Sequence, residues 1–176
     1  MKYEITEVEG FKDLLLVRYD IFKDERGSIF SSFDTDLIEV FSKKKHLDLN
    51  FTHNKFTRSK FNVLRGIHGD NKTYKLVQCL EGDVFQVAVD LNPKSKNYKK
   101  HFSINLSGKD NLALLIPPNF GNAFYTKSNN SLYNYTLSYR GDYADVENQF
   151  TAIWDSPDFN IDWPCDNPIL QQRDKK

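Results

Sequence analysis

The sequence predicts an all-β fold of the sandwich or barrel kind, formed by one domain over residues 1–176. The chain is rich in aromatic residues, with 14 Phe and 9 Tyr, and aromatic side chains favour pleated, half-buried surfaces. About ten short segments rich in β-branched and aromatic residues alternate with turn residues, which is the spacing of sandwiches and barrels. No repeat, low-complexity tract or Pro/Gly/Ser linker divides the sequence, so a single domain is expected.

The alternating segments define the expected strands. We expect strands over residues 13–19, 28–33, 51–56, 62–68, 74–80, 83–91, 101–106, 113–116, 122–126 and 132–139. The clearest hairpin is predicted where Glu81-Gly82-Asp83 joins two alternating strands, because Gly stands at the centre of a three-residue turn.

Two segments do not follow the strand pattern. Residues 36–44 have an apolar stripe at helical spacing after the capping candidates Asp34 and Thr35, which predicts a short helix. The tail from Trp154 onward has too many Pro and Asp residues for regular structure. We expect this tail to wrap the barrel.

Charge and composition restrict the partners. The 24 basic and 24 acidic side chains cancel, so the chain has no global field that favours nucleic acid or an anionic membrane. The first twenty residues mix charges with apolar residues, which argues against a secretory signal or a membrane span and for a cytoplasmic location. Cys79 and Cys165 lie far apart in the sequence, and we interpret both as reduced thiols.

Metal and nucleotide-loop chemistry are disfavoured. The histidines, His46, His53, His68 and His101, are not spaced as chelating neighbours, and the His-x-His pair of metal-binding cupins is missing. The Gly-rich motifs of Rossmann and P-loop proteins and the Gly-x-Ser-x-Gly elbow are also missing from the sequence.

Three patterns could carry chemistry. Arg65 and His68 flank Gly66, and a glycine bulge could turn both side chains to one cavity, although a surface arginine and a satisfied histidine are the commoner outcome of such a pattern. Lys75 shares its strand face with apolar residues, which indicates either a lined pocket or an edge position that reaches solvent. Tyr135 belongs to a stripe of aromatic side chains that is more often core than catalytic.

Seven segments in order resemble the dTDP-4-dehydrorhamnose 3,5-epimerase family over nearly the whole chain. They are DERGSIF, SKFNVLRGIH, KLVQCLEGDVFQVAVDL, LLIPPNFGNAFYT, LYNY, IWDSPDFNIDWP and LQQRD. The resemblance implies a cupin-like jelly-roll β-barrel with one or two short helices. It also implies an isomerase that needs no cofactor, takes a nucleotide-diphosphate sugar as its partner and forms a homodimer.

Carried over by position, the resemblance assigns four catalytic residues. His68 would be the base that removes a proton beside the ketone, and Asp174 would hold the other ring nitrogen. Tyr135 would return a proton from the opposite face of the sugar, and Lys75 would lie near the developing enolate oxygen.

The resemblance also implies substrate-binding residues. Arg65 would face the sugar or the diphosphate, and Arg26 would contact the diphosphate, either within its own chain or across a dimer. Asn122 stands where most members have a histidine, so a group that can titrate is replaced by one that only donates and accepts hydrogen bonds. His53 and Lys55 stand where the family commonly has Gln and Asn. These differences from the family pattern gather around the expected ligand.

The activity expected is therefore epimerisation at C3, C5 or both of a nucleotide-linked 4-keto-6-deoxy sugar, in bacterial surface polysaccharide biosynthesis. Because the catalytic set is intact while the lining has changed, we expect a non-standard sugar nucleotide, for example a GDP-linked 4-keto-6-deoxy-heptose. Two alternatives are a cupin-type sugar-nucleotide 3,4-ketoisomerase and a non-catalytic sugar-nucleotide binding protein.

Overall fold

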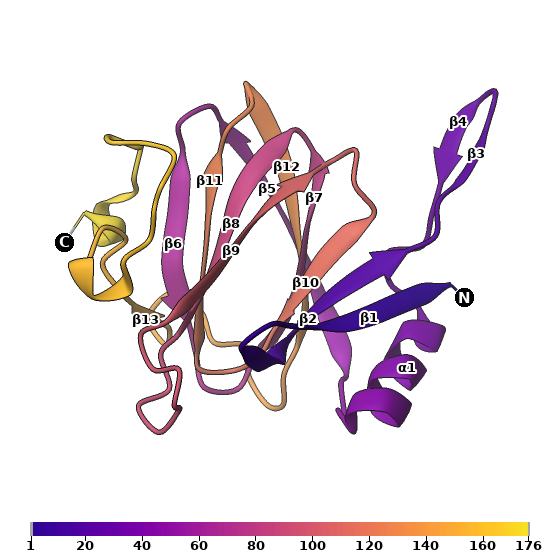
Figure 1. Ribbon diagram of the computed structural model, residues 1–176, viewed down its shortest axis with the longest axis horizontal. Coiled ribbons are helices and arrows are strands. Elements are labelled where there is room, and N and C mark those ends of the chain that lie inside the picture. The colour runs from indigo at the N-terminus through magenta and orange to yellow at the C-terminus, as the bar shows by residue number, and fades with distance from the viewer. Residues whose placement is uncertain (1, 176) are drawn as a thin grey trace.

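Two antiparallel sheets face each other in the computed structural model, which describes residues 2–175 (Figure 1). The six-stranded sheet contains, in spatial order, β1 (Tyr3–Val8), β2 (Phe11–Tyr19), β10 (Leu112–Ile116), β7 (Tyr74–Glu81), β12 (Asn130–Ser138) and β5 (Phe51–Lys60). The five-stranded sheet contains β13 (Phe150–Thr151), β6 (Leu64–Gly69), β11 (Phe120–Thr126), β8 (Asp83–Asp90) and β9 (His101–Ser107). The predicted all-β, cupin-like jelly roll is thus confirmed.

The core lies between the sheets, and each sheet is also covered on its outer face. On β2, Leu14 packs into the core between the sheets, whereas Leu15 and Val17 pack outside it with the helix. Because a strand alternates its side chains between faces, burial on both sides explains why this segment is an unbroken apolar run.

The helix α1 (Thr35–Lys45) confirms the predicted helix and covers the outer face of the six-stranded sheet. The Asp34 side chain accepts a hydrogen bond from the backbone N–H of Leu37 (3.1 Å), which satisfies one of the free donors of the first turn. Leu37 and Phe41 are fully buried against the sheet, and each contributes about 1.5–3 kcal/mol by leaving water. No helix within residues 2–175 is long and apolar enough to cross a membrane.

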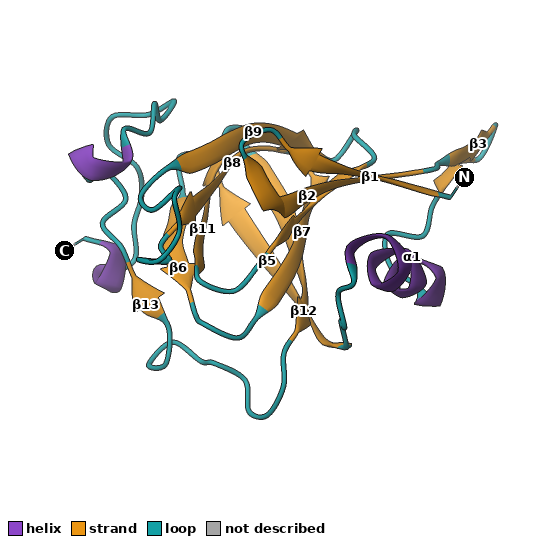
Figure 2. Ribbon diagram, turned by 60° about the horizontal axis from the view of Figure 1, so that its bottom comes forward, coloured by secondary structure: helices purple, strands orange, loops and turns teal. Residues whose placement is uncertain are grey.

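The C-terminal segment covers the outer face of the other sheet, opposite α1 (Figure 2). It contains two short 3₁₀ helices, η1 (Pro157–Phe159) and η2 (Gln172–Asp174). Phe159 packs with Ile67 and Val87 of the five-stranded sheet, and Trp163 lies edge-on to Phe85. The expectation of a tail that lies irregularly over the barrel therefore agrees with the structure.

The predicted hairpin across Glu81-Gly82-Asp83 is wrong. Strands β7 and β8 are consecutive in sequence but belong to different sheets, where β7 pairs with β10 and β12 and β8 pairs with β9 and β11. Gly82 forms the corner at which the chain changes sheets. Its φ is +79°, and an added Cβ would lie 2.1 Å from the carbonyl oxygen of Asn130. A turn with central Gly is equally compatible with a hairpin and with such a corner, so the local sequence could not distinguish them.

The N-terminal strands also differ from expectation. The predicted strand over residues 28–33 is reduced to β4 (Gly27–Ile29), which pairs with β3 (Phe22–Asp24) in a hairpin that projects from the barrel (Figure 1). After Ile29 the chain leaves the strand, and the Phe30 ring stacks on Tyr19 with 5.2 Å between ring centroids. Strand β1 was not predicted, although Tyr3 and Ile5 alternate there with polar residues.

We predict that Gly82→Ala destabilises the protein far more than Gly10→Ala. Both glycines have positive φ, +79° and +81°, but a Cβ at Gly10 would meet nothing within 4 Å. Gly10→Ala should therefore lower the free energy of unfolding by only the left-handed strain of about 1–2 kcal/mol. Gly82→Ala adds the clash with backbone and should cost about 3 kcal/mol or more. Urea unfolding of both variants provides the measurement, and equal losses would show that the corner is not crowded.

Candidate active site

One end of the barrel interior is polar and opens into a cavity of about 250 Å³ between the sheets. Six of the residues singled out in the sequence line it: Lys55, Arg65, His68, Lys75, Asn122 and Tyr135. They come from both sheets, with His68 on β6 of the five-stranded sheet and Tyr135 on β12 of the six-stranded sheet. The two side chains proposed to move protons therefore face one cavity from opposite walls.

The bulge expected at Gly66 is present. His68 pairs with Asn122 and Arg65 pairs with Phe124, so three steps on β6 match two steps on β11. Because of the extra residue, Arg65 and His68 both reach the cavity although they are three positions apart. Gly66 is required there, since an added Cβ would lie 2.2 Å from the Cβ of Ala123.

The imidazole of His68 is held between two residues of the C-terminal segment. Its Nε2 lies 2.6 Å from Oδ1 of Asp174, whose side chain is completely buried. Its Nδ1 lies 2.8 Å from Nη2 of Arg173. The pairing of His68 with Asp174 agrees with the resemblance, whereas the contact with Arg173 was not anticipated from the sequence. The position of Arg173 beside Asp174 was the only available signal.

Lys75 lies in a pocket and not at an edge. It is only 6% exposed, and its Nζ lies 3.6 Å from Oδ2 of Asp70. Burial lowers the pKa of Lys75, and the Asp70 carboxylate opposes this shift. Burial favours the neutral acid of Asp70, but the Lys75 charge and hydrogen bonds from Lys72 and Thr73 hold the pKa of Asp70 below its usual value. Asp70 therefore acts as the counter-charge of the cavity ammonium.

The aromatic stripe of β12 serves both core and cavity. Tyr133 is fully buried and stacks on Phe124, with 4.0 Å between ring centroids. Tyr135, two residues further, contacts Tyr133 edge-on and lines the cavity. Burial raises the pKa of Tyr135, with Arg65 acting in the opposite direction. The phenol therefore keeps its proton at neutral pH.

The amide of Asn122 has a fixed orientation. Gln86 Nε2 donates to the carbonyl oxygen of Val87 (2.8 Å) and to Oδ1 of Asn122 (2.7 Å), while Gln86 Oε1 accepts from the Tyr133 hydroxyl. A carbonyl oxygen can only accept, so the amide nitrogen of Gln86 must be on this side. Oδ1 of Asn122 is thereby engaged, which places its Nδ2 on the opposite side of the amide.

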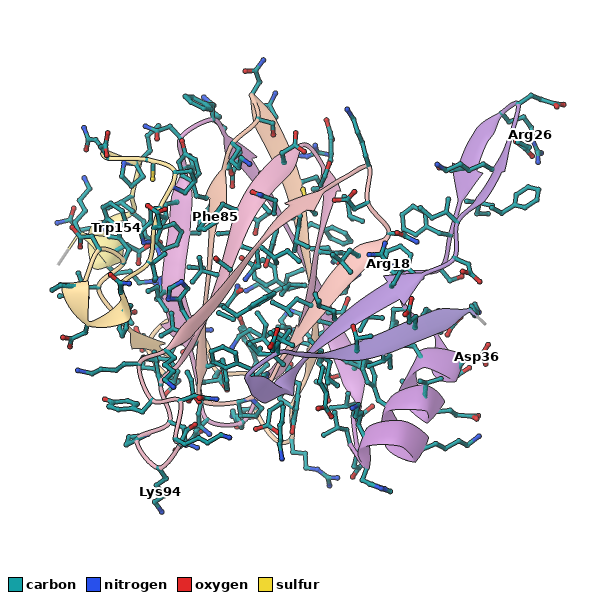
Figure 3. All side chains as sticks on the ribbon, viewed as in Figure 1. Arg18, Arg26, Asp36, Phe85, Lys94 and Trp154 are labelled. Atoms are coloured by element: carbon teal, nitrogen blue, oxygen red, sulfur yellow. The ribbon has the colours of Figure 1, made fainter. Side chains whose placement is uncertain are left out.

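Three predicted residues lie outside the cavity lining: Asp174, which holds His68 from behind, His53 and Arg26. The Nδ1 of His53 lies 3.3 Å from the Tyr139 hydroxyl, and its ring packs edge-on against Tyr143, which does line the cavity. Arg26 lies at the tip of the projecting hairpin, where it pairs with Asp24 (Figure 3). Within one chain the structure does not bring Arg26 to the other predicted residues.

Unsatisfied polar atoms mark this cavity as functional. The structure has five buried side-chain nitrogen or oxygen atoms without a hydrogen-bond partner among the described residues: Asp70 Oδ2, Thr73 Oγ1, Lys75 Nζ, Arg173 Nε and Asp174 Oδ2. All five belong to residues that line the cavity or hold His68 from behind. Burying an unpaired polar group is costly, so their concentration indicates a site built for a polar ligand.

A larger and more open hollow of about 590 Å³ lies beside α1. There Lys45 pairs with Glu7 (2.6 Å), and Asp90 accepts from the backbone N–H of Asn92 (3.0 Å). None of the buried polar atoms that lack a hydrogen bond within the described residues belongs to this lining. The smaller cavity is therefore the better candidate.

Comparison with known proteins agrees with this geometry. Residues 9–176 match the family model described as dTDP-4-dehydrorhamnose 3,5-epimerase. A protein of that name from Salmonella typhimurium is 32% identical over 92% of this chain and 87% of its own length. Another from Methanothermobacter thermautotrophicus is 29% identical over 97% of this chain and 89% of its own length.

Solved structures give the same result. A dTDP-6-deoxy-D-glucose-3,5-epimerase of Legionella pneumophila, crystallised with dTDP-4-keto-L-rhamnose, has a TM-score of 0.88 at 29% identity. The match covers 98% of this chain and 89% of that one. A dTDP-4-dehydrorhamnose 3,5-epimerase of Elizabethkingia anophelis has a TM-score of 0.87 at 26% identity, over 99% and 94% of the two chains.

We predict that Asp70→Asn makes the Lys75 amine reactive at lower pH. Asp70 raises the pKa of Lys75 against the effect of burial, so removing the carboxylate must lower that pKa further and enlarge the neutral, nucleophilic fraction. Acetylation of Lys75 by acetic anhydride, followed by peptide mass spectrometry across a pH series, measures this. The exposed Asp166→Asn provides the matched control, and identical pH profiles for all three proteins would contradict the assignment of Asp70 as counter-charge.

Proposed function

The chain belongs to the dTDP-4-dehydrorhamnose 3,5-epimerase family, whose members are isomerases, and we propose that it inverts C3, C5 or both of a nucleotide-linked 4-keto-6-deoxy sugar. The observation that carries the proposal is that His68 and Tyr135 line one cavity from opposite sheets. Inversion needs a base on one face of the sugar ring and an acid on the other, and this arrangement supplies both.

The chemistry follows from the ketone. A carbonyl at C4 acidifies the hydrogens at C3 and C5, so His68 can remove one as a proton while the electron pair moves to the carbonyl oxygen. Lys75 and the amide of Asn122, which both line the cavity, provide donors for the oxygen that becomes negative. Asp174 stabilises the imidazolium through Nε2. Tyr135 then protonates the carbon from the opposite face.

The proposed substrate is a GDP-linked 4-keto-6-deoxy-heptose in place of a deoxythymidine-linked hexose. The support comes from the altered lining. Lys55 lies at the cavity, where its Nζ donates to the Tyr143 hydroxyl (2.8 Å), and the His53 ring packs on the same tyrosine. A lysine donor suits the O6 and N7 acceptors of guanine, and Arg65 is one of the cavity cations that can face the diphosphate or the sugar.

We extend the proposal to the cellular setting. Residues 1–176 would act as one cytoplasmic domain that makes a sugar nucleotide for bacterial surface polysaccharide, either capsule or O-antigen. These statements rest on the family and on the sequence.

We further propose a homodimer in which Arg26 reaches the cavity of the partner subunit. The hairpin that carries Arg26 projects away from its own barrel (Figure 1). It exposes Phe22 (62%), Ile29 (70%) and Phe30 (40%). Such an apolar surface on a projecting element is typical of a segment that packs on another protein, and a two-fold dimer is the commonest arrangement.

We predict that His68→Asn abolishes solvent exchange at the sugar carbons. Wild-type protein incubated in deuterated water with the 4-keto sugar nucleotide should incorporate deuterium at C3 or C5 without moving the ketone. Loss of the base should reduce the exchange rate by about 10²–10⁴-fold. The affinity for GDP, measured by calorimetry, should change only a few fold. In both proteins GDP should bind more tightly than dTDP. A ketone found at C3 would favour the ketoisomerase, and wild-type protein that binds without any exchange would favour a binding module.

We predict that Arg26→Ala and His68→Asn subunits complement each other. Each variant alone should have low activity, but a mixed dimer contains one site with an intact His68 and an Arg26 supplied by the partner. Equal mixing with random pairing should restore about a quarter of wild-type exchange, because half the dimers carry one intact site of two. Mixing His68→Asn with the double variant is the control, and failure to complement after verified subunit exchange would place Arg26 outside the partner's site.

A further inference from the structure

The contact between Arg173 and His68 fixes the protonation form of the imidazole. Arg173 Nη2 lies 2.8 Å from His68 Nδ1, and a guanidinium has donors but no acceptor. Nδ1 must therefore be the unprotonated nitrogen. A neutral imidazole then has its hydrogen on Nε2, which points at Oδ1 of Asp174. The consecutive residues Arg173 and Asp174 of η2 thus hold both nitrogens of one ring and select one tautomer.

The lone pair of His68 lies on the side of the cavity. His68 and Arg173 both line the cavity, whereas Asp174 does not and its side chain is completely buried behind the ring. Nδ1 is consequently the nitrogen that can accept a proton from a ligand in the cavity. In the structure the guanidinium covers that nitrogen.

The guanidinium is weakly held apart from this contact. Its Nε is buried without a hydrogen-bond partner among the described residues and lies 3.7 Å from Oδ1 of Asp174. Its Nη1 has only a long contact, 3.4 Å, with the carbonyl oxygen of Val146. A cation with unused donors gains by turning to better acceptors, so a ligand rich in oxygen can draw it away from His68.

We propose that Arg173 is a positioning residue that caps the lone pair of His68 in the empty site and turns aside when the substrate binds. The inference rests on the proposed function, because it takes His68 as the base. Before binding, the cap keeps Nδ1 free of hydrogen, so that the ring hydrogen lies on Nε2. When a nucleotide sugar enters, its oxygen atoms accept the guanidinium donors and Nδ1 becomes free to take the proton from carbon. The proton moves to Nδ1, and Nε2 keeps its hydrogen bond to Asp174.

The cap can be observed directly by nitrogen NMR of protein with ¹⁵N-labelled histidine. Spectra taken at pH 8.5, well above the ordinary histidine pKa of about 6.5, report hydrogen bonding at each ring nitrogen. The resonances of His68 are those that disappear in His68→Asn. We expect an unprotonated Nδ1 in wild type and a downfield shift of its resonance in Arg173→Met, where the donor is lost. Arg173→Lys, which keeps a charged donor, should stay near the wild-type position. Arg173→Ala replaces the methionine variant if that variant does not fold.

Displacement is tested by adding the unreactive 4-hydroxy nucleotide sugar, which has no ketone. Saturation with this nucleotide sugar should move the wild-type Nδ1 resonance toward its position in Arg173→Met. In Arg173→Met itself the Nδ1 resonance should stay nearly unchanged. An Nδ1 resonance at the same position in wild type and Arg173→Met overturns the cap, and so does binding of the nucleotide sugar with no change at Nδ1. A nucleotide sugar that does not bind at all counts against the proposed function, while the comparison of the free proteins still decides whether the cap exists.

Discussion

The hydrogen bond between His68 and Asp174 ties the C-terminal segment to a strand of the barrel, and the geometry of the site depends on it. The two residues are separated by 106 positions in the sequence. They can meet only if the tail packs over the five-stranded sheet, which Phe159 and the parallel bridge between Val63 and Ile169 achieve. The same bond that orients the imidazole therefore depends on apolar packing outside the barrel. A change that loosens the C-terminal segment should therefore also change the orientation of the His68 imidazole.

The polar end of the barrel is maintained against the usual preference of protein interiors. Polar atoms of Asp70, Thr73 and Lys75 lie buried around the cavity without a hydrogen bond to the described residues, although Asp70 and Lys75 form an ion pair. Their burial costs free energy that the apolar end must offset. A ligand with oxygen atoms at the right positions recovers part of that cost on binding. These buried polar atoms therefore also indicate what kind of ligand the cavity fits. They provide hydrogen-bond donors for oxygen atoms and positive charge for a phosphate.

The sequence predicts those features correctly that are determined by neighbouring residues. The α1 helix follows from its Asp34 cap and apolar stripe, and the expected bulge at Gly66 depends on a glycine within a strand. Sheet membership at Gly82 could not be deduced, because a hairpin and a corner require the same glycine. The contact of Arg173 with His68 depends on how the tail packs, a long-range property that no nearby residue encodes. The resemblance selected six of the residues that line the cavity, but within one chain the structure does not bring Arg26 to them.

Because His68 and Tyr135, the proposed base and acid, stand on separate sheets, the distance between them is set by the side chains that hold the sheets apart. Facing sheets lie about 10 Å from each other, and an error of about 1 Å in a catalytic geometry can cost about 10²-fold in rate. Tyr133, stacked on Phe124, is one of the spacers immediately beside the cavity. The catalytic rate should therefore respond strongly to small changes in core packing. Substitutions of buried residues outside the cavity should therefore lower the catalytic rate before they prevent folding, and natural selection would act on them through catalysis.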